Sequence, residues 1–253
     1  MDTGLKGKRA IVTGGGRGIG KEIALNLASE GVKVCVLSRT EEELKSVCEE
    51  ILDKGGNACY KVFDLVSGDY QKLKSEISEE VGNIDILVNN AAKPSKPQKL
   101  SFLNDEEWYK VIETDLNSQF KIIKQFINDM RDNKWGRIVI IGSLSGMFGA
   151  SGYSAYCTVK SGLEGLTKNL AVDYSKYGIT INMVSPGFVE TERFKKAAPE
   201  EMVQKFISAT STKRLAKPKD IANAVTFLSS DLASYITGVN LPVCGGLNLG
   251  NLW

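Results

Sequence analysis

Short runs of apolar, mostly β-branched residues alternate with longer stretches of helical periodicity along the first three quarters of the chain. The runs read KRAIVT, VKVCVLS, ACYKVFDL, IDILVNN, GRIVIIGS and ITINMVSPG. Their hydrophobicity is nearly continuous, which is typical of strands buried on both faces of a parallel sheet. A last strand is expected within GVNLPVCGG, close to the end of the chain.

The stretches between these runs have the spacing of apolar residues that predicts helices. The predicted helices cover residues 19–29, 41–54, 70–81, 106–132, 153–177 and about 220–230. Regular alternation of strand and helix favours right-handed βαβ crossovers. We therefore expect an α/β fold over residues 1–253, a single-domain Rossmann-like doubly wound parallel sheet with helices on both faces.

Two segments, 93–105 and 188–217, are the least like regular structure. Each follows the end of a predicted strand, and open α/β sheets bind their ligands outside the carboxyl ends of their strands. We expect the second segment to close over a substrate.

Composition excludes several classes of function. The 253 residues are 42% hydrophobic, and 32 basic residues face 30 acidic ones without a basic block, so nucleic acid is not an expected partner. The five cysteines are scattered and contain no Cys-x-x-Cys pair, which indicates a reducing compartment. No apolar run approaches the roughly 18 residues of a membrane span, so we expect a cytoplasmic protein without a membrane partner.

The chain contains no histidine. A Ser-His-Asp or Cys-His mechanism is therefore impossible, and the common zinc and non-haem iron sites lose their usual ligand. We expect no metal site. Acid–base chemistry must use tyrosine, lysine, cysteine or carboxylates.

A glycine-rich turn, VTGGGRGIG, joins the first predicted strand to the first helix. Its glycines are spaced Gly14-x-x-x-Gly18-x-Gly20, which differs from the Gly-x-Gly-x-x-Gly fingerprint. Glycines permit positive φ and close backbone approach, and the N–H groups at a helix start can hold a pyrophosphate. The turn, with Arg17 and Ile19 inside it, thus predicts a dinucleotide site, although glycines can also serve only a tight turn.

The end of the second strand, LSRTEEE, bears on the choice of dinucleotide. NAD sites place an acidic residue about 20 positions beyond the turn, whereas a 2′-phosphate favours a nearby arginine. Ser38 occupies the expected acidic position, Arg39 follows it, and Arg17 lies in the turn. Glutamates 41–43 are interpreted as ordinary partners of a helix dipole. NADP(H) is the favoured cofactor.

Tyr156 and Lys160, in SAYCTVKSGLEG, are four residues apart on a predicted helix. Such residues lie on one face, about 5–6 Å apart at Cβ, and could share a site. A core tyrosine beside a lysine that extends to solvent would have the same spacing. Tyr70 and Lys74 repeat it, so spacing alone does not decide.

Several motifs in order resemble the short-chain dehydrogenase/reductase family over essentially the whole chain. TGGGRGIG resembles the family's TGxxxGxG turn, NNAA its NNAG segment, YCTVK its YxxxK and SPGFVET its PGxxxT, while Ser143 lies thirteen residues before Tyr156. The resemblance implies further cofactor contacts, with Asp64 at the adenine and Pro186 and Thr191 beside the nicotinamide. The remaining implied contacts are Leu65, Asn90, Tyr156, Lys160, Gly187 and Val189.

The resemblance also implies a catalytic group. Tyr156 would donate a proton, Lys160 would stabilise the tyrosinate and hydrogen-bond the nicotinamide ribose, and Ser143 would hydrogen-bond the substrate oxygen. Tyr70 and Lys74 have no serine at the upstream interval and are interpreted as a solvated helix face.

Two residues depart from the family pattern. Asp115 takes the place of a catalytic asparagine that helps hold a water chain leading to the lysine. An ionised Asp115 would oppose formation of the tyrosinate, so we expect it to shift the pH–rate profile without abolishing turnover. Ala92 replaces a glycine and adds a methyl group beside the cofactor.

Within the family the chain is most like 3-oxoacyl-[acyl-carrier-protein] reductases, which implies a 3-oxoacyl thioester substrate. Lys134, Arg137 and Lys176 are candidates for steering an acidic carrier protein at the site mouth, although surface lysines are usually only solvated. A ketone of a small polyol, sugar or secondary metabolite is the alternative substrate, and a non-catalytic cofactor-binding regulator or scaffold is an alternative of another class. The resemblance implies a homotetramer, and the ending GLNLGNLW with Trp253 would suit either a subunit contact or the chain's own core.

Overall fold

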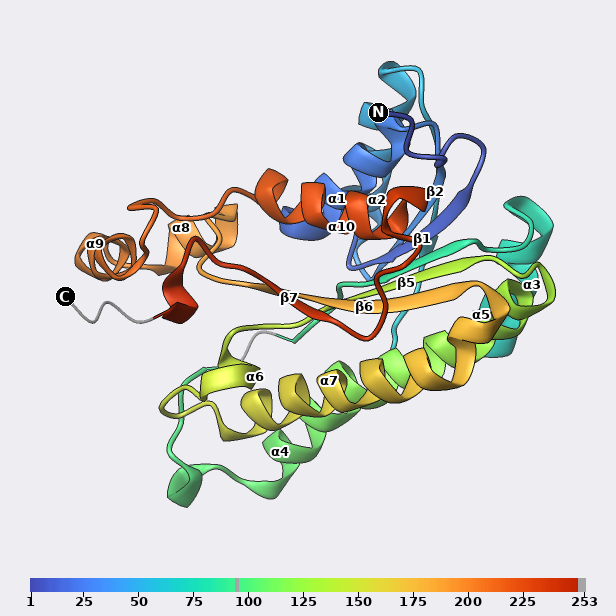
Figure 1. The fold of residues 1–253 in the computed structure, drawn as a ribbon. Helices are drawn as coiled ribbons and strands as arrows, with labels where there is room; N and C mark the ends of the chain where they lie inside the picture. The colour runs from blue at the N-terminus through green and yellow to red at the C-terminus, as the bar shows by residue number, and fades with distance from the viewer. Residues whose placement is uncertain (94–95, 250–253) are drawn as a thin grey trace.

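A computed structural model describes residues 1–93 and 96–249 of the chain. The predicted ending at Trp253 therefore lies outside the described residues. Seven parallel strands form one sheet in the order β3-β2-β1-β4-β5-β6-β7 (Figure 1). The strands are β1 (Arg9–Thr13), β2 (Lys33–Ser38), β3 (Asn57–Val62), β4 (Ile86–Asn89), β5 (Gly136–Ile141), β6 (Ile179–Pro186) and β7 (Asn240–Val243).

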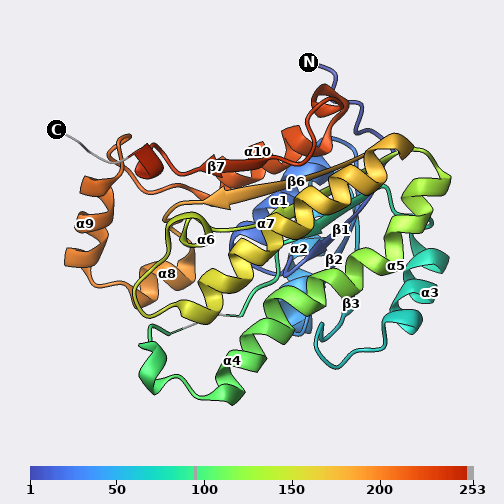
Figure 2. The same cartoon turned by 60° about the horizontal axis from the view of Figure 1, so that its bottom comes forward.

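Helices cover both faces of this sheet (Figures 1 and 2). One face carries α1 (Gly18–Ser29), α2 (Glu41–Asp53) and α10 (Pro218–Ser229). The other carries α3 (Tyr70–Glu80), α4 (Asp105–Ile112), α5 (Ser118–Asp132) and α7 (Ser154–Tyr174). The chain reverses its direction across the sheet between β1 and β4, which confirms the doubly wound fold predicted from the alternating pattern.

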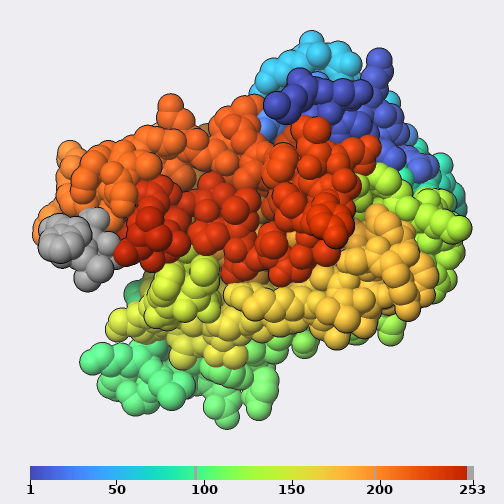
Figure 3. All heavy atoms as spheres, in the orientation of Figure 1, coloured from blue at the N-terminus to red at the C-terminus, as the bar shows by residue number. Residues whose placement is uncertain are grey.

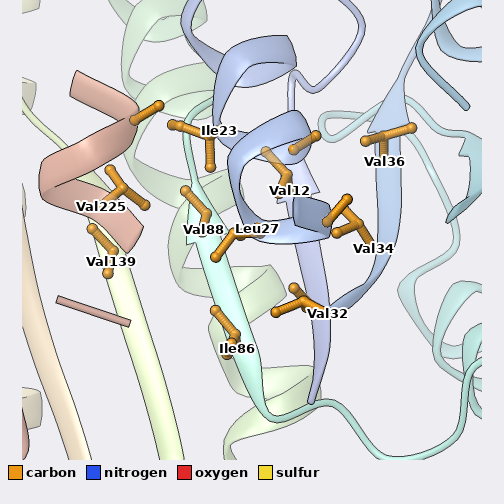
Figure 4. Packing of buried hydrophobic residues seen from close by; sticks show 14 of the residues in the cluster. Val12, Ile23, Leu27, Val32, Val34, Val36, Ile86, Val88, Val139 and Val225 are labelled. Atoms are coloured by element: carbon orange, nitrogen blue, oxygen red, sulfur yellow. The ribbon is translucent and has the colours of Figure 1, made fainter. Parts of the chain in front are cut away.

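Continuous apolar strands give each face its own core. On the α1 side, Val12 and Val88 from the sheet meet Ile23 and Leu27 of α1 and Val225 of α10 (Figure 4). All five side chains are fully buried. Each such burial contributes roughly 1.5–3 kcal/mol before the loss of conformational entropy, so the packed faces hold the strand ends in fixed relative positions.

The segment 188–217, predicted as irregular, contains α8 (Glu192–Ala197) and α9 (Glu200–Ala209). Pro199 separates the two helices, and Thr191 caps α8 by accepting a hydrogen bond from the Phe194 N–H. Figure 3 shows these helices as an orange lobe at one end of the molecule. The predicted helix at residues 153–177 ends in η3 (Ser175–Tyr177), and the short elements not predicted from the sequence are η1 (Leu100–Phe102), α6 (Ser145–Phe148), η4 (Asp231–Ala233) and η5 (Leu247–Leu249).

The interpretation of Tyr70 and Lys74 as a solvated helix face is wrong. The Tyr70 hydroxyl donates to the Leu65 carbonyl over 2.6 Å, and burial raises the pKa of this phenol well above its usual range. Lys74 forms an ion pair with Asp129 of α5 and lies 4.6 Å from the ring centroid of Phe126. The two residues pack α3 against α5, and that packing is their function in the fold.

Among the described residues, no helix combines the length and apolarity that a membrane span requires.

Candidate active site

The carboxyl ends of the parallel strands meet at one edge of the sheet, at the left in Figure 1 where α6 and α8 begin. The glycine turn after β1 lies there. Gly14 and Gly18 have φ of +64° and +56°, a region that favours glycine. A methyl group at Gly20 would lie 2.2 Å from the Gly14 carbonyl oxygen. The turn therefore requires glycine at position 20 because the backbone segments approach closely there, and at positions 14 and 18 because of their positive φ.

Asn90 holds the glycine turn from the neighbouring strand. Its side-chain amide donates to the carbonyls of Thr13 and Gly14 over 2.9 and 3.2 Å. The Thr13 hydroxyl in turn accepts the N–H groups of Asn90 and Ala91, both over 3.0 Å. Thr13 was not among the sequence predictions, although a hydroxyl residue directly before the glycines could have indicated it.

The start of α1 fits a pyrophosphate. Its N-cap residue, Arg17, gives no side-chain hydrogen bond to the helix, and the first turn contains no acidic residue. The first N–H groups therefore remain without a side-chain cap at the positive end of the helix dipole. Together with the glycine turn, these N–H groups have the arrangement expected of a site for dinucleotide phosphates.

The predicted adenosine contacts gather at the ends of β2 and β3. The Ser38 hydroxyl bonds to the backbone of Thr40, and Arg39 is exposed. Arg17 forms an ion pair with Glu43, with 3.1 Å between Nη1 and Oε1. Sequence reasoning treated Glu43 only as a dipole partner, because a linear pattern does not reveal that α2 begins beside the glycine turn.

Asp64 and Leu65, beyond β3, are both partly buried. The Asp64 carboxylate accepts the Val66 N–H over 2.8 Å, which fixes the direction of this side chain.

The predicted nicotinamide contacts follow β6. Thr191 lies against the glycine turn, because a methyl group at Gly18 would be 3.4 Å from its Cγ2. The Gly187 N–H donates to the Val243 carbonyl over 3.1 Å, which anchors the strand end to β7. Pro186 and Val189 are buried on either side of it. The two halves of the predicted cofactor site are therefore contiguous.

Tyr156 and Lys160 lie on α7, and the Lys160 side chain reaches the end of β5. The Lys160 ammonium, on a side chain only 2% exposed, donates to the Ile141 carbonyl over 2.9 Å and lies 5.5 Å from the centroid of the Tyr156 ring. Ser143 is two residues beyond Ile141, and its hydroxyl oxygen accepts the Ser145 N–H over 3.1 Å. A methyl group at Gly146 would lie 2.8 Å from Lys160, so α6 packs directly on α7.

Within the part of the chain that the structure describes, Lys160 and Ser143 keep N–H and O–H donors without a partner. An ammonium has three N–H donors, and only one of those on Lys160 is used by Ile141. The Ser143 oxygen accepts one bond and keeps its own O–H to donate. A buried cation next to a phenol can stabilise its anion, and a neighbouring hydroxyl can stabilise charge on a substrate oxygen.

Asp115 lies within a π-helical turn, η2 (Glu113–Asn117), that joins α4 to α5. Its side chain is fully buried, and Oδ1 accepts the Lys93 N–H over 2.6 Å. Oδ2 has no hydrogen-bond partner among the described residues. Burial raises the pKa of Asp115, while the positive charge of Lys160 and the Lys93 N–H oppose this increase. The predicted departure from the family pattern therefore lies next to the Lys160 charge.

Two further buried polar residues lie in this region: Asn89, the first residue of the NNAA segment, and Gln119, which was not predicted. The Asn89 amide donates to the Gln119 carbonyl over 3.3 Å. Asn89 Oδ1 and both amide atoms of Gln119 have no partner within the described part of the chain. Buried polar atoms without partners are costly to the folded state. Gln119 follows Asp115 by about one helical turn, so the two residues lie on similar faces of the helix.

Ala92, the second departure from the family pattern, is exposed.

Replacing Asp115 by Asn is expected to move the alkaline limb of the kcat/KM profile to lower pH while retaining turnover. The neutral amide removes a buried negative charge that interacts with the Lys160 cation, the group proposed to stabilise the tyrosinate. Burial raises the pKa of Asp115 in the folded state, so the neutral carboxyl contributes to the free energy of unfolding. This contribution is fully present below the pKa of the unfolded state and is lost as the pH rises through the pKa of the folded state. The variant should therefore gain Tm at pH 7, with a smaller gain near pH 4. Superimposable rate profiles for the two proteins would contradict this prediction.

The positions predicted for three basic residues at the mouth of the active site are wrong. These residues are Lys134, Arg137 and Lys176. All three lie near the amino ends of β5 and β6, at the opposite edge of the sheet. Lys134 occupies a tight turn with φ of +52°, and Arg137 is buried. The Arg137 guanidinium donates to three backbone carbonyls and pairs with Asp231 over 3.0 Å, which explains its burial.

Comparison with known proteins places these residues in a family. A family model described as enoyl-(acyl carrier protein) reductase matches residues 14–248. The 3-oxoacyl-[acyl-carrier-protein] reductase FabG of Haemophilus influenzae is 39% identical over 97% of this chain and 100% of its own length. The FabG of Escherichia coli is 38% identical over 96% of this chain and 98% of its own.

Solved structures agree with the fold. One from Agrobacterium tumefaciens, provisionally assigned as a gluconate dehydrogenase, has a TM-score of 0.93 at 28% identity and covers 98% of both chains. Another from Beutenbergia cavernae, provisionally assigned as an NAD(P)-dependent gluconate 5-dehydrogenase and solved with NADP at low occupancy, has a TM-score of 0.92 at 32% identity over 99% of this chain and 100% of its own. Because the family model and these relatives span nearly the whole chain, the protein belongs to the short-chain dehydrogenase/reductase family.

Proposed function

We propose that this protein is an NADPH-dependent carbonyl reductase that acts on a 3-oxoacyl thioester carried by an acyl carrier protein. The observation that carries the proposal is the buried Lys160 ammonium, which bonds the Ile141 carbonyl two residues before Ser143 and lies 5.5 Å from the centroid of the Tyr156 ring. The glycine turn lies at the same edge of the sheet. FabG relatives at 38–39% identity support the substrate, and the NADP in the Beutenbergia structure supports the cofactor.

In the proposed reaction, bound NADPH supplies a hydride to the carbonyl carbon. The Ser143 O–H donates to the carbonyl oxygen as negative charge develops there, and the Tyr156 hydroxyl transfers its proton to that oxygen. The Lys160 ammonium, held by the Ile141 carbonyl, stabilises the tyrosinate that remains. Gain of one hydride and one proton converts the ketone to a secondary alcohol, and the tyrosine then takes a proton from solvent.

We propose that the pyrophosphate is held by the glycine turn and the start of α1. The 2′-phosphate would be held by Ser38, Arg39 and Arg17. Asp64, Leu65 and Asn90 would complete the adenosine side, while Pro186, Gly187, Val189 and Thr191 would border the nicotinamide. Asn90 acts in this proposal through the shape of the turn, because both of its amide bonds go to backbone carbonyls of that turn. Residues 188–217, with α8 and α9, would close over the substrate.

The resemblance further supports a homotetramer in a reducing cytoplasm. Phe120 of α5 and Val172 of α7 are 50% and 82% exposed, and a second copy could cover them. All five cysteines are free, which suits a reducing compartment. Light scattering on the purified protein would measure the mass of the assembly, and a monomeric mass would contradict the tetramer.

The test of the function is an assay that follows the absorbance of reduced nicotinamide. We expect NADPH oxidation with acetoacetyl thioester, faster than with NADH, and a lower KM when the acyl group is on a carrier protein than on a pantetheine analogue. A crotonyl thioester tests the enoyl reduction named in the family description. Tight NADPH binding without turnover of any ketone or enoyl thioester would favour a non-catalytic binding protein.

A sugar or polyol dehydrogenase is the second candidate, and the two gluconate dehydrogenase structures support it. Their identities of 28% and 32% are lower than those of the FabG relatives. Gluconate with NADP⁺ belongs in the same assay. Reduction of NADP⁺ by gluconate, with no activity on the thioester, would replace the first proposal by the second.

A further inference from the structure

We propose that Glu43 sets the nucleotide selectivity of this protein by restraining Arg17 and by opposing a 2′-phosphate with its own negative charge. The inference rests on the proposed use of NADPH. It assigns a selectivity role to an acidic residue on α2, outside the glycine turn and outside the strand ends.

The geometry brings three groups to one place. Glu43 Oε1 lies 3.1 Å from Arg17 Nη1. A methyl group at Gly16 would lie 3.0 Å from Glu43 Cβ, 3.2 Å from its Oε2 and 3.4 Å from the Ser38 hydroxyl. The Glu43 carboxylate therefore borders the turn and the end of β2, where the ribose of the adenosine half is expected.

The three glutamates that begin α2 have different partners. Glu41 pairs with Lys45 and accepts the Tyr60 hydroxyl. Glu42 is exposed and forms no ion pair with any residue that the structure describes. All three lie in the favourable field at the helix start, so the dipole does not distinguish them. Glu43 is the one that pairs with the glycine turn.

A 2′-phosphate carries nearly two negative charges, whereas NADH has a neutral hydroxyl at that position. To bind the 2′-phosphate, the Arg17 guanidinium must break its ion pair with Glu43 or divide its N–H donors between the two anions. The phosphate must also approach the negatively charged Glu43 carboxylate. The pair is solvent-accessible, with side-chain exposures of 69% for Arg17 and 31% for Glu43, so screening limits the effect. We expect a change of about three- to tenfold in NADPH affinity and very little in NADH affinity.

The test compares Glu43→Gln with Glu42→Gln, which removes the same charge from the same helical turn. Dissociation constants for NADPH and NADH are measured by fluorescence of the reduced nicotinamide. Glu43→Gln should lower the Kd for NADPH by about three- to tenfold and leave that for NADH within about twofold, while Glu42→Gln leaves both within about twofold. Raising the salt concentration from about 0.05 to 0.5 M should shrink the difference.

Weaker NADPH binding by Glu43→Gln would overturn the inference, because the ion pair would then be orienting Arg17 for the phosphate. Equal changes in both variants, or in both nucleotides, would overturn it as well. These results differ from a failure of the proposed function: a wild-type protein that binds NADH more tightly than NADPH contradicts the cofactor itself. Thermal melts of the three proteins confirm that each is folded.

Discussion

Replacing Tyr156 by Phe is expected to lower kcat for ketone reduction by about 10²–10⁴-fold, the usual contribution of a positioned general acid. The substitution removes one hydroxyl and retains the ring that lies 5.5 Å from the Lys160 ammonium. Because the ring, Lys160 and the glycine turn are all retained, we expect the Kd for NADPH to stay within about twofold of the wild-type value. Steady-state rates and nucleotide titrations on the same preparation measure both quantities.

Tyr153→Phe is the matched control for this prediction. Its ring centroid lies 6.3 Å from that of Tyr156, so the control removes a phenol hydroxyl from the immediate surroundings. We expect it to retain most of the activity. A Tyr156→Phe protein that reduces ketones as fast as the wild type would exclude Tyr156 as the proton donor and favour a different catalytic group.

Replacing Gly20 by Ala should raise the Kd for NADPH by about five- to 150-fold, the equivalent of roughly 1–3 kcal/mol of overpacking. The added methyl would lie 2.2 Å from the Gly14 carbonyl oxygen and 2.5 Å from Asn90 Nδ2. Its nearest obstacle is backbone, so the glycine turn and the start of α1 must separate. That displacement moves the N–H groups proposed to bind the pyrophosphate.

Gly165→Ala on α7 provides the control, because a methyl group there would meet no atom within 4 Å outside its own helical turn among the described residues. Alanine is intrinsically better in a helix than glycine by about 1 kcal/mol, so this variant should be slightly more stable and bind NADPH normally. Isothermal titration of both variants separates the two effects. Unchanged affinity in Gly20→Ala would mean that the turn tolerates a wider opening and does not cradle the phosphates.

Much of the fold was predictable because buried parallel strands are apolar throughout. The strands predicted within VKVCVLS and GRIVIIGS have bounds close to those of β2 and β5. The helix predicted for residues 153–177 corresponds to α7 followed by η3. The glycine turn and the Tyr156–Lys160 pair were also predictable, since both are local patterns. The segment 188–217 was not, because α8 and α9 are short and Pro199 interrupts their pattern.

Residues whose role depends on distant partners could not be predicted. Arg137 has the sequence appearance of a surface charge, yet backbone carbonyls of Gly178 and Ser230 accept its N–H groups. The π-helical turn at Asp115 lies inside a stretch that was correctly predicted as helical. The turn itself could not be predicted, because the spacing of apolar residues does not show where backbone hydrogen bonds change from the i+4 to the i+5 pattern. The Glu43–Arg17 pair joins residues 26 positions apart in different elements.

The amide of Asn90 has a consequence for how the nucleotide is recognised. Because this side chain bonds the carbonyls of Thr13 and Gly14, the loop is ordered when the polypeptide folds. The conformational entropy of the glycines in this turn is then lost during folding and does not have to be lost when a nucleotide binds. Preorganisation of this kind would help the N–H groups that we propose for the pyrophosphate to bind a strongly hydrated anion, and it would make the end of β4, which leads into Asn90, a determinant of affinity.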